Sequence, residues 1–394
     1  MKRTRTQVAI IGAGPAGLVL AHLLHLEGIE TVVIESRSRA SIETRLRAGL
    51  LEQEGADLLI DTGVGDRLLR ERLLHHGVYI KFRDRLHRID FADLVGKSIM
   101  IYAQQEIVKD LVAARLGYDE PLLFEVHDVQ LDGLQDARPS IRFTAADGQQ
   151  RLDCDFIAGC DGFHGVSRPS IPQRALTEFV KDYPFGWLGI LADAPPTEDE
   201  LVYTHHQRGF ALLTMRTMSL SRLYLQCPRE DVIENWSDDR IWEELRLRTA
   251  GDGHPLSEGP ILQKAITDMR SFVVEPMQFG RLFLAGDAAH IVPPTGAKGM
   301  NLAIADVRVL ARALTAYYQD GRRDLLDAYS RVCLRRVWMV QRFSWWVTQL
   351  LHRFDDDNAF DLRRQLAEID YVTGSRAGAM TWAENYVGLP MQWE

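Results

Sequence analysis

The sequence predicts a mixed α/β fold: a Rossmann-like domain, an antiparallel-sheet domain and a helical C-terminal region. Three observations support this prediction. Gly12-Ala13-Gly14-Pro15-Ala16-Gly17 stands between a buried apolar run and an amphipathic stretch. Residues 183–269 alternate in polarity with the period of half-buried strands. Residues 334–352 carry apolar and aromatic side chains at helical spacing.

Composition limits the classes of function. The chain has 394 residues, which favours two closely packed domains over one core. Its 46% hydrophobic and 26% charged content is that of a globular protein, and a net charge of −9 argues against nucleic acid as a partner. No apolar run has membrane-spanning length, and residues 1–7 run straight into a strand, unlike a signal peptide. We therefore expect no membrane association.

Cysteine usage gives the expected compartment. The four cysteines show no metal-ligand spacing, so we predict no metal site; they are Cys154, Cys160, Cys227 and Cys333. Free thiols are typical of a reducing cytoplasm, and we expect a cytoplasmic protein.

The N-terminal motif lies in the context of a nucleotide-binding unit. A strand at residues 8–11 leads into the glycines, a helix follows through Leu20, and a second strand at residues 31–34 ends at Glu35. Glycines allow backbone amides to approach a pyrophosphate, and a carboxylate at this place accepts from ribose hydroxyls. The motif alone leaves FAD and NAD both open.

A second ligand-binding stretch runs from Gly286 to Asn301. A buried strand at residues 281–285 precedes it, and a helix is predicted to begin near Gly299. Asp287 at the strand end can accept from ligand hydroxyls, and the first helical amides can face negative charge. Pro293-Pro294 stiffens the loop and leaves its carbonyls free of a helix.

Other stretches are weaker signals. Residues 45–52 carry two cations spaced to flank phosphates, although a solvated charged face gives the same pattern. Strands are expected within residues 78–101, before Gln104, and His75 with His76 precedes them. Residues 153–168 form another strand ending in a Gly-rich turn. A simple NAD dehydrogenase needs only one such turn.

The sheet-rich insert groups polar side chains. Thr214 and Arg216 share one face of a strand, and Tyr224 lies on the next strand, with Tyr203 before them. These groups can form the polar end of an apolar pocket. A solvated sheet face explains the alternation equally well.

Together, Gly12–Gly17 with Glu35, Asp161-Gly162 and Gly286-Asp287 resemble the signatures of the single-component flavoprotein aromatic hydroxylases. The resemblance covers nearly the whole chain, including residues 45–49, 160–165, 183–187, 270–277, 286–301 and 384–390. It implies FAD-binding parts at residues 1–182, with a small sheet excursion near 73–102, and at 270–320. It also implies a substrate-binding sheet at 183–269 and a helical region at 321–394 that forms a homodimer contact.

The resemblance implies an FAD-dependent monooxygenase that uses NADPH, or possibly NADH, together with O2. The expected reaction converts 4-hydroxybenzoate to 3,4-dihydroxybenzoate through a flavin C4a-hydroperoxide and a substrate phenolate. Alternative substrates are 4-aminobenzoate and 3,4-dihydroxybenzoate. Alternative functions on the same scaffold are a flavin dehydrogenase or oxidase, and a flavin-binding redox sensor.

The resemblance also implies roles for individual residues. Those expected to bind FAD are Gly12, Gly14, Ala16, Gly17, Glu35, Arg45, Leu46, Arg47, Ala48, Gly49, Leu50, Gln104, Asp161, Asp287, Gly296, Gly299, Met300 and Asn301. Those expected to bind the aromatic substrate are Tyr203, Thr214, Met215, Arg216, Tyr224 and Pro294, with Arg216, Thr214 and Tyr224 at its carboxylate. Tyr203, Tyr386 and His75 are expected to relay the phenol proton, with the Pro294 carbonyl against the ring. The residues expected to bind NAD(P)H are Arg37, Arg39, Arg47, Phe163, His164, Arg168 and Arg270.

Two positions depart from the family pattern. Thr214 stands where the family has Ser, which keeps the hydroxyl and adds a methyl group. Residues 36–41 lack the Arg and Tyr that read the 2′-phosphate in NADPH-specific members. Because guanidinium groups suit a phosphate, Arg37 and Arg39 are the expected replacements.

Overall fold

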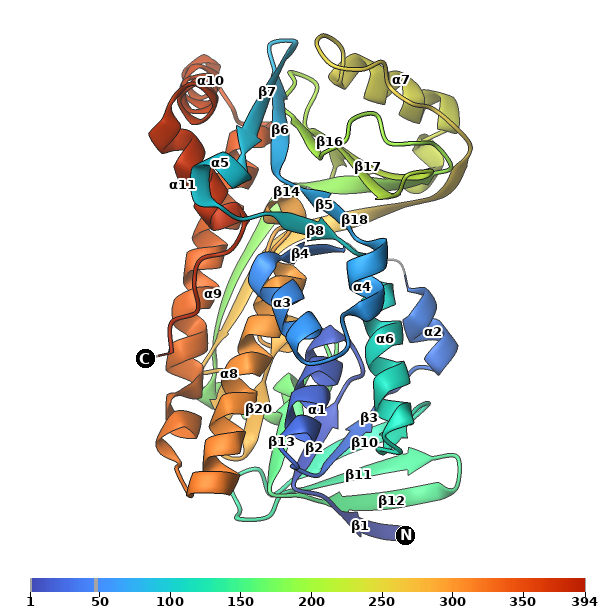
Figure 1. The fold of residues 1–394 in the computed structure, drawn as a ribbon, viewed down its shortest axis with the longest axis vertical. Helices are drawn as coiled ribbons and strands as arrows, with labels where there is room; N and C mark the ends of the chain where they lie inside the picture. The colour runs from blue at the N-terminus through green and yellow to red at the C-terminus, as the bar shows by residue number, and fades with distance from the viewer. Residues whose placement is uncertain (1, 46–48, 394) are drawn as a thin grey trace.

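A computed structural model describes residues 2–45 and 49–393 and shows the predicted α/β architecture (Figure 1). Its nucleotide-binding part is built on a six-stranded sheet of order β19-β20-β13-β2-β3-β9. The strands are β2 (Val8–Ile11), β3 (Thr31–Ile34), β9 (Leu122–Leu123), β13 (Phe156–Gly159), β19 (Gln278–Phe279) and β20 (Leu282–Leu284). All except β19 run parallel. The strands predicted at residues 8–11, 31–34 and 281–285 are therefore confirmed as β2, β3 and β20.

Helices cover this sheet because its strands are apolar on both faces. The covering helices are α1 (Pro15–Leu26), α6 (Gln104–Gly117) and α8 (Gly299–Asp320), of which α1 packs against both others. Pro15 occupies the first turn of α1, where its missing N–H costs no hydrogen bond. The predicted start of a helix at Gly299 is confirmed.

The second large sheet has eight strands in the order β21-β18-β14-β17-β16-β15-β6-β7. The strands are β6 (Gly77–Phe82), β7 (Arg85–Asp90), β14 (Thr177–Ala192), β15 (Val202–Thr204), β16 (Ala211–Thr217), β17 (Leu220–Pro228), β18 (Ile261–Glu275) and β21 (His290–Ile291). The sheet thus recruits strands from both sides of the predicted insert, and α7 (Asp238–Arg248) adds a helix to it. Both predicted insert boundaries fall inside continuous strands, β14 and β18, and the division into domains remains a prediction.

Smaller elements complete the framework. A four-stranded sheet contains β1 (Lys2–Arg5), β10 (His127–Asp132), β11 (Ser140–Ala145) and β12 (Gly148–Asp153). A three-stranded sheet contains β4 (Leu50–Glu52), β5 (Leu73–His75) and β8 (Ile99–Ile101). The short helices are α2 (Arg39–Thr44), α3 (Gln53–Asp61), α4 (Asp66–Glu71) and α5 (Phe91–Val95).

Three helices form the C-terminal region: α9 (Asp324–Leu351), α10 (Ala359–Gly374) and α11 (Arg376–Tyr386). Figure 1 shows α9 running along α8 toward the eight-stranded sheet, and the two helices pack together. One face of α9 is buried, whereas Trp338 and Trp345 remain 42% and 45% exposed. No helix within the described part of the chain is long and apolar enough to cross a membrane. All four cysteines are buried and unbridged.

Candidate active site

The N-terminal turn has the close packing that a nucleotide cradle requires. Gly12 has a φ of +102°, and a Cβ there would lie 2.4 Å from the Cys160 carbonyl oxygen. A Cβ on Gly17 would lie 2.0 Å from the Gly12 carbonyl oxygen, whereas one on Gly14 would meet nothing within 4 Å. The open side of the turn therefore lies at Gly14, at the start of α1, where a pyrophosphate would approach the helix amides.

Glu35 is fixed by the backbone around it. Its Oε2 accepts from the Ala13 N–H at 2.8 Å, and its Oε1 accepts from the Arg37 N–H at 2.9 Å. A carboxylate carries about four lone-pair sites, so these bonds leave capacity for the two hydroxyls of a ribose. The turn and the carboxylate together fit the adenosine half of FAD.

The second Gly-rich turn is held by a buried carboxylate. Asp306 on α8 accepts from the Gly286 N–H at 2.9 Å and from His290 Nε2 at 2.6 Å. Both Asp306 and His290 are 2% exposed, and the carboxylate raises the pKa of the imidazole despite its burial. Asp287 lies between Gly286 and His290, the two residues that Asp306 holds, and it is exposed whereas they are buried. This is the position expected for a group that accepts from a ligand.

The start of α8 provides free amides for a ligand. Its N-cap position, Lys298, supplies no side-chain cap, so the first-turn amides of Gly299, Met300 and Asn301 point away without intrahelical partners. The Asn301 side chain has another use. Its Oδ1 accepts from the Glu52 N–H at 2.9 Å, and its Nδ2 donates to the Leu50 carbonyl at 2.9 Å. Only the backbone of Asn301 remains to meet a cofactor.

Other predicted FAD residues lie around these turns. Asp161 folds its own loop, because its Oδ2 accepts from the Ser167 N–H and hydroxyl at 2.9 and 3.0 Å. Gly49 lies against Ala103, next to Gln104 at the start of α6. Leu46, Arg47 and Ala48 lie outside the described residues.

Four of the six predicted substrate residues come together on one face of the eight-stranded sheet: Tyr203, Thr214, Arg216 and Tyr224. By strand alternation Met215 lies on the opposite face, and Pro294 lies in the turn before α8. Strand register aligns Tyr203, Leu212, Tyr224 and Gly189 in one cross-strand row. Thr214 and Arg222 form the neighbouring row. Gly189 leaves the space that the larger side chains occupy, since a Cβ there would lie 2.7 Å from Arg222 Nη2.

Two arginines surround the Tyr224 phenol. Burial opposes its ionisation, but Arg216 and Arg222 outweigh that effect and lower the pKa of Tyr224. Arg222 Nε donates to the Tyr224 hydroxyl at 3.3 Å. Burial lowers the pKa of Arg216, although the nearby Tyr224 phenol acts to raise it. This end of the face is therefore strongly cationic and suited to a carboxylate. Arg222 had no predicted role, although its position two residues before Tyr224 places it on the same face.

The opposite end of the face carries a tyrosine pair. The Tyr203 and Tyr386 hydroxyls lie 2.5 Å apart, and their side chains are 1% and 0% exposed. Burial raises the pKa of both phenols, so both are neutral near pH 7. The structure thus joins two residues that are 183 positions apart in the chain.

His75 is connected to this pair through Phe91 and the backbone of His76. Phe91 stacks on the Tyr386 ring with centroids 5.2 Å apart, and its N–H donates to the carbonyl of His76, the next residue after His75. The His75 ring is 1% exposed, and neither nitrogen has a hydrogen-bond partner among the described residues. Burial lowers its pKa to about 4. The imidazole is therefore neutral and has both nitrogens available.

A hydrogen-bonded chain that was not predicted supports the Pro-Pro loop. Trp187 Nε1 donates to His352 Nε2 at 2.7 Å, and His352 Nδ1 lies 3.1 Å from the Thr348 carbonyl. The Thr348 hydroxyl donates to the Thr295 hydroxyl at 3.0 Å, next to Pro294. Trp187 also packs on Tyr224 with ring centroids 5.0 Å apart. No spacing pattern in the sequence predicts these contacts.

A buried ion pair, also not predicted, lies beneath the start of α8. Lys298 Nζ donates to Glu52 Oε1 at 2.6 Å and to the Tyr386 carbonyl at 2.7 Å. Lys298 is 2% exposed. The pair therefore connects α8 to α11, the helix that carries Tyr386.

The residues predicted to bind NAD(P)H are partly grouped. The Arg168 guanidinium lies 4.5 Å and that of Arg270 5.3 Å from the Phe163 ring centroid, and His164 packs edge-on against that ring. In α2, Arg39 Nε donates to Glu43 Oε1 at 2.7 Å. Arg37 is exposed.

Comparison with known proteins shows the family of the chain. Residues 5–344 match the FAD-binding domain family. A p-hydroxybenzoate hydroxylase from Acinetobacter baylyi is 50% identical over 394 residues, covering 100% of this chain and 97% of the relative. Among solved structures, p-nitrophenol 4-monooxygenase from Pseudomonas putida DLL-E4 superposes with a TM-score of 0.81 at 18% identity, covering 99% of this chain and 100% of that one. A probable FAD-dependent monooxygenase from Pseudomonas aeruginosa superposes at 0.76 with 21% identity, covering 93% and 99%.

The chain belongs to the FAD-binding domain family, as an aromatic hydroxylase of the p-hydroxybenzoate hydroxylase type. It is therefore a flavoprotein monooxygenase whose cofactor is FAD.

Proposed function

We propose that the enzyme hydroxylates 4-hydroxybenzoate at the 3-position, with NADPH and O2 as co-substrates. The observation that carries this proposal is the polarity of the sheet face, with paired cations at one end and the Tyr203–Tyr386 pair at the other. A para-substituted benzoate has matching ends. The 50% identity to a protein named for this activity supports the same choice.

The cationic end would hold the substrate carboxylate. Arg216 offers paired N–H donors to it, and the Thr214 and Tyr224 hydroxyls complete the set. Because Thr214 and Met215 are 8% and 2% exposed, this end excludes water and strengthens the charge pairing. A clamp at the carboxylate also fixes which ring carbon faces the Pro294 side of the pocket. The extra methyl of Thr214 narrows the space beside the carboxylate.

The tyrosine end would remove the phenol proton. Aromatic hydroxylation needs an electron-rich ring, which a phenolate provides and a neutral phenol does not. Tyr203 can accept from the substrate phenol while donating to Tyr386, so a concerted shift moves the phenol proton to Tyr203 and the Tyr203 proton to Tyr386, whose own proton passes to His75. After the shift, Tyr203 donates to the phenolate oxygen. His75 is neutral and unpartnered, which suits the last acceptor before solvent.

FAD, when bound, takes up a hydride from the nicotinamide and activates O2. The residues that would hold it are Gly12, Gly14, Ala16, Gly17 and Glu35 at the adenosine half and Asp287 with the α8 amides at the flavin half. The positive end of α8 favours an anionic reduced flavin. Phe163, Arg168 and Arg270 would hold the coenzyme. Arg39 is paired with Glu43, so we assign 2′-phosphate recognition mainly to Arg37 and expect NADH to be used as well.

Product analysis tests this function. The holoenzyme is incubated in air with NADPH and, separately, 4-hydroxybenzoate, 4-aminobenzoate and 3,4-dihydroxybenzoate. We expect 3,4-dihydroxybenzoate from the first acid and the highest turnover with it. Faster hydroxylation of either other acid would assign the enzyme to that substrate, and NADPH oxidation without any hydroxylated product would favour an oxidase.

We propose a cytoplasmic homodimer that uses the exposed aromatic face of α9. Trp338 lies against Phe179 of β14 with ring centroids 5.3 Å apart, and Phe179 and Val180 are 42% and 58% exposed. An apolar patch across two elements is typical of a subunit contact. Light scattering should give twice the chain mass, and Trp338→Glu should give a monomer.

A further inference from the structure

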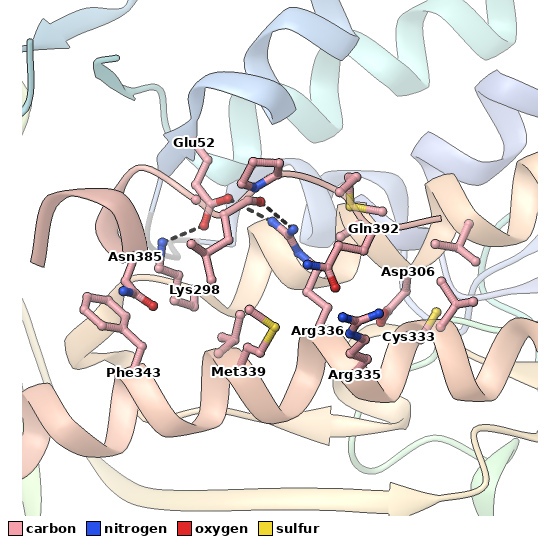
Figure 2. Close-up of a pocket in the computed structure, with 18 residues that line it drawn as sticks. Glu52, Lys298, Asp306, Cys333, Arg335, Arg336, Met339, Phe343, Asn385 and Gln392 are labelled. Carbon is pink, nitrogen blue, oxygen red and sulfur yellow. Dashed lines mark hydrogen bonds and ion pairs between the residues drawn. The ribbon is translucent and has the colours of Figure 1, made fainter. Parts of the chain in front are cut away.

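A cavity lies between α8, α9 and the residues that follow α11, apart from the sheet face described above (Figure 2). Cavity and mouth together hold about 600 Å³ of space between atoms, part of which is open solvent. The apolar side chains that line it are Val309, Val332, Met339, Val340, Phe343 and Met391. Such a wall suits the hydrocarbon part of a small molecule.

Residues 388–392 form a strap over this cavity. Arg336 Nη1 donates to the Leu389 carbonyl at 2.7 Å, which holds the strap to α9. Beyond the strap, the Trp393 ring packs against Arg308 and Arg312, whose guanidinium carbons lie 5.6 and 4.9 Å from its centroid. Two rigid helices thus form the floor, and a short nonhelical segment forms the cover.

The cavity carries excess positive charge. The Glu52 carboxylate meets two cations, Lys298 at 2.6 Å and Arg336 at 3.3 Å. The other acidic residue in the lining, Asp306, is already bonded to His290 and the Gly286 N–H. Arg335 adds a further cation, at the exposed side of the cavity. Because one carboxylate faces both Lys298 and Arg336, the cavity wall keeps one positive charge there without an acidic partner. The charge of Arg335 is a second one.

Two hydrogen-bond donors are also unused. Arg336 Nε is buried and has no hydrogen-bond partner among the described residues. The Arg335 side chain makes no ion pair or hydrogen bond within residues 2–45 and 49–393. A buried donor without an acceptor costs free energy, and a carboxylate bound in the cavity that both arginines line would supply the missing acceptor.

We propose that this cavity is a second binding site for a small aromatic carboxylate, with its carboxylate at Arg335 and Arg336 and its ring against the apolar wall. The aromatic character of the ligand rests on the proposed function, because substrate and product of that reaction are such acids. The site adjoins the relay, since Lys298 and Asn385 line the cavity and Lys298 also donates to the Tyr386 carbonyl.

Calorimetric titration of the FAD-loaded enzyme with 4-hydroxybenzoate tests the proposal. We expect two binding events per chain. Arg335→Glu should weaken one event at least tenfold and leave the other unchanged, whereas Arg331→Glu, an exposed arginine one turn earlier on α9, should leave both unchanged. Met391→Trp, which fills the cavity from the strap, should abolish the same event as Arg335→Glu.

Arg216→Gln separates this inference from the proposed function. It should remove the other event and keep the one that depends on Arg335. If no event depends on Arg216, the proposed substrate site is wrong while the cavity site stands. A single event per chain in the wild type, or two events that both survive Arg335→Glu and Met391→Trp, would overturn the cavity site. A crystal soaked with 4-bromobenzoate should show anomalous density for bromine in the cavity of the wild type and none in Arg335→Glu.

Discussion

Tyr203→Phe is the perturbation that most sharply separates ring activation from binding. The substitution removes one oxygen from a side chain that is 1% exposed and leaves the ring packing in place. It deletes the 2.5 Å hydrogen bond to Tyr386 and with it the proton path away from the substrate. Substrate affinity should change little, because the carboxylate clamp at Arg216 lies at the other end of the face.

The size of the effect follows from the lost hydrogen bond. A hydrogen bond to a charged group contributes about 1.5–3 kcal/mol, which corresponds to roughly a 10- to 150-fold fall in the rate of oxygen transfer. Because flavin reduction does not need the phenolate, NADPH oxidation should continue and yield hydrogen peroxide. Product and peroxide are measured in parallel against NADPH consumed. Hydroxylation by Tyr203→Phe with wild-type coupling would refute the relay and return Tyr203 to a structural role.

Further predictions concern the rest of the site. Tyr386→Phe should uncouple more mildly than Tyr203→Phe, and His75→Ala should chiefly slow proton exchange with solvent, both followed by the same product and peroxide assay. Arg216→Ala should weaken 4-hydroxybenzoate binding by about 3–5 kcal/mol with FAD retained, since it leaves a buried carboxylate unpaired; equal affinity in a fluorescence titration would show that the clamp lies elsewhere. Arg37→Ala should raise the KM for NADPH and leave that for NADH unchanged, and a clear wild-type preference for NADH would contradict phosphate recognition by Arg37. Burial lowers the pKa of His75 to about 4 and of His352 to about 3, so the unfolded chain takes up protons first as pH falls below about 6.5. The free energy of unfolding should therefore fall between about pH 6.5 and pH 4 by roughly 3 kcal/mol for each histidine, and His352→Gln should remove about half of this slope in urea titrations.

Local patterns predicted much of the fold. The glycine turn at 12–17 and the strand ending at Glu35 lie close together in the chain, and the period-two alternation around Tyr224 specifies a strand face without any tertiary information. The start of α8 followed from Gly299 and the apolar spacing after it. The place of β6 in the eight-stranded sheet was not predicted, because its pairing with β15 joins residues far apart in sequence and leaves no periodic signal.

The parts of the site that local patterns missed depend on long-range contacts. Trp187 and His352 are 165 positions apart, and Lys298 and Glu52 are 246 apart. Lysine is usually exposed, so the burial of Lys298 could not be expected from its residue type; its ion pair with Glu52 offsets the cost of burying the charge. The Asn301 side chain is a further example, because its contacts with Glu52 and Leu50 link α8 to β4 over about 250 positions, while the predicted FAD contact of Asn301 stays a prediction for its backbone.

The most direct test of the proposed reaction is isotopic. The FAD-loaded enzyme is supplied with NADPH and 4-hydroxybenzoate under ¹⁸O2, and the product is analysed by mass spectrometry while NADPH consumption is recorded. The reaction as proposed predicts 3,4-dihydroxybenzoate carrying one ¹⁸O atom, formed nearly one for one with NADPH consumed. NADPH consumption that yields peroxide only, or a product whose new oxygen comes from water, would contradict it.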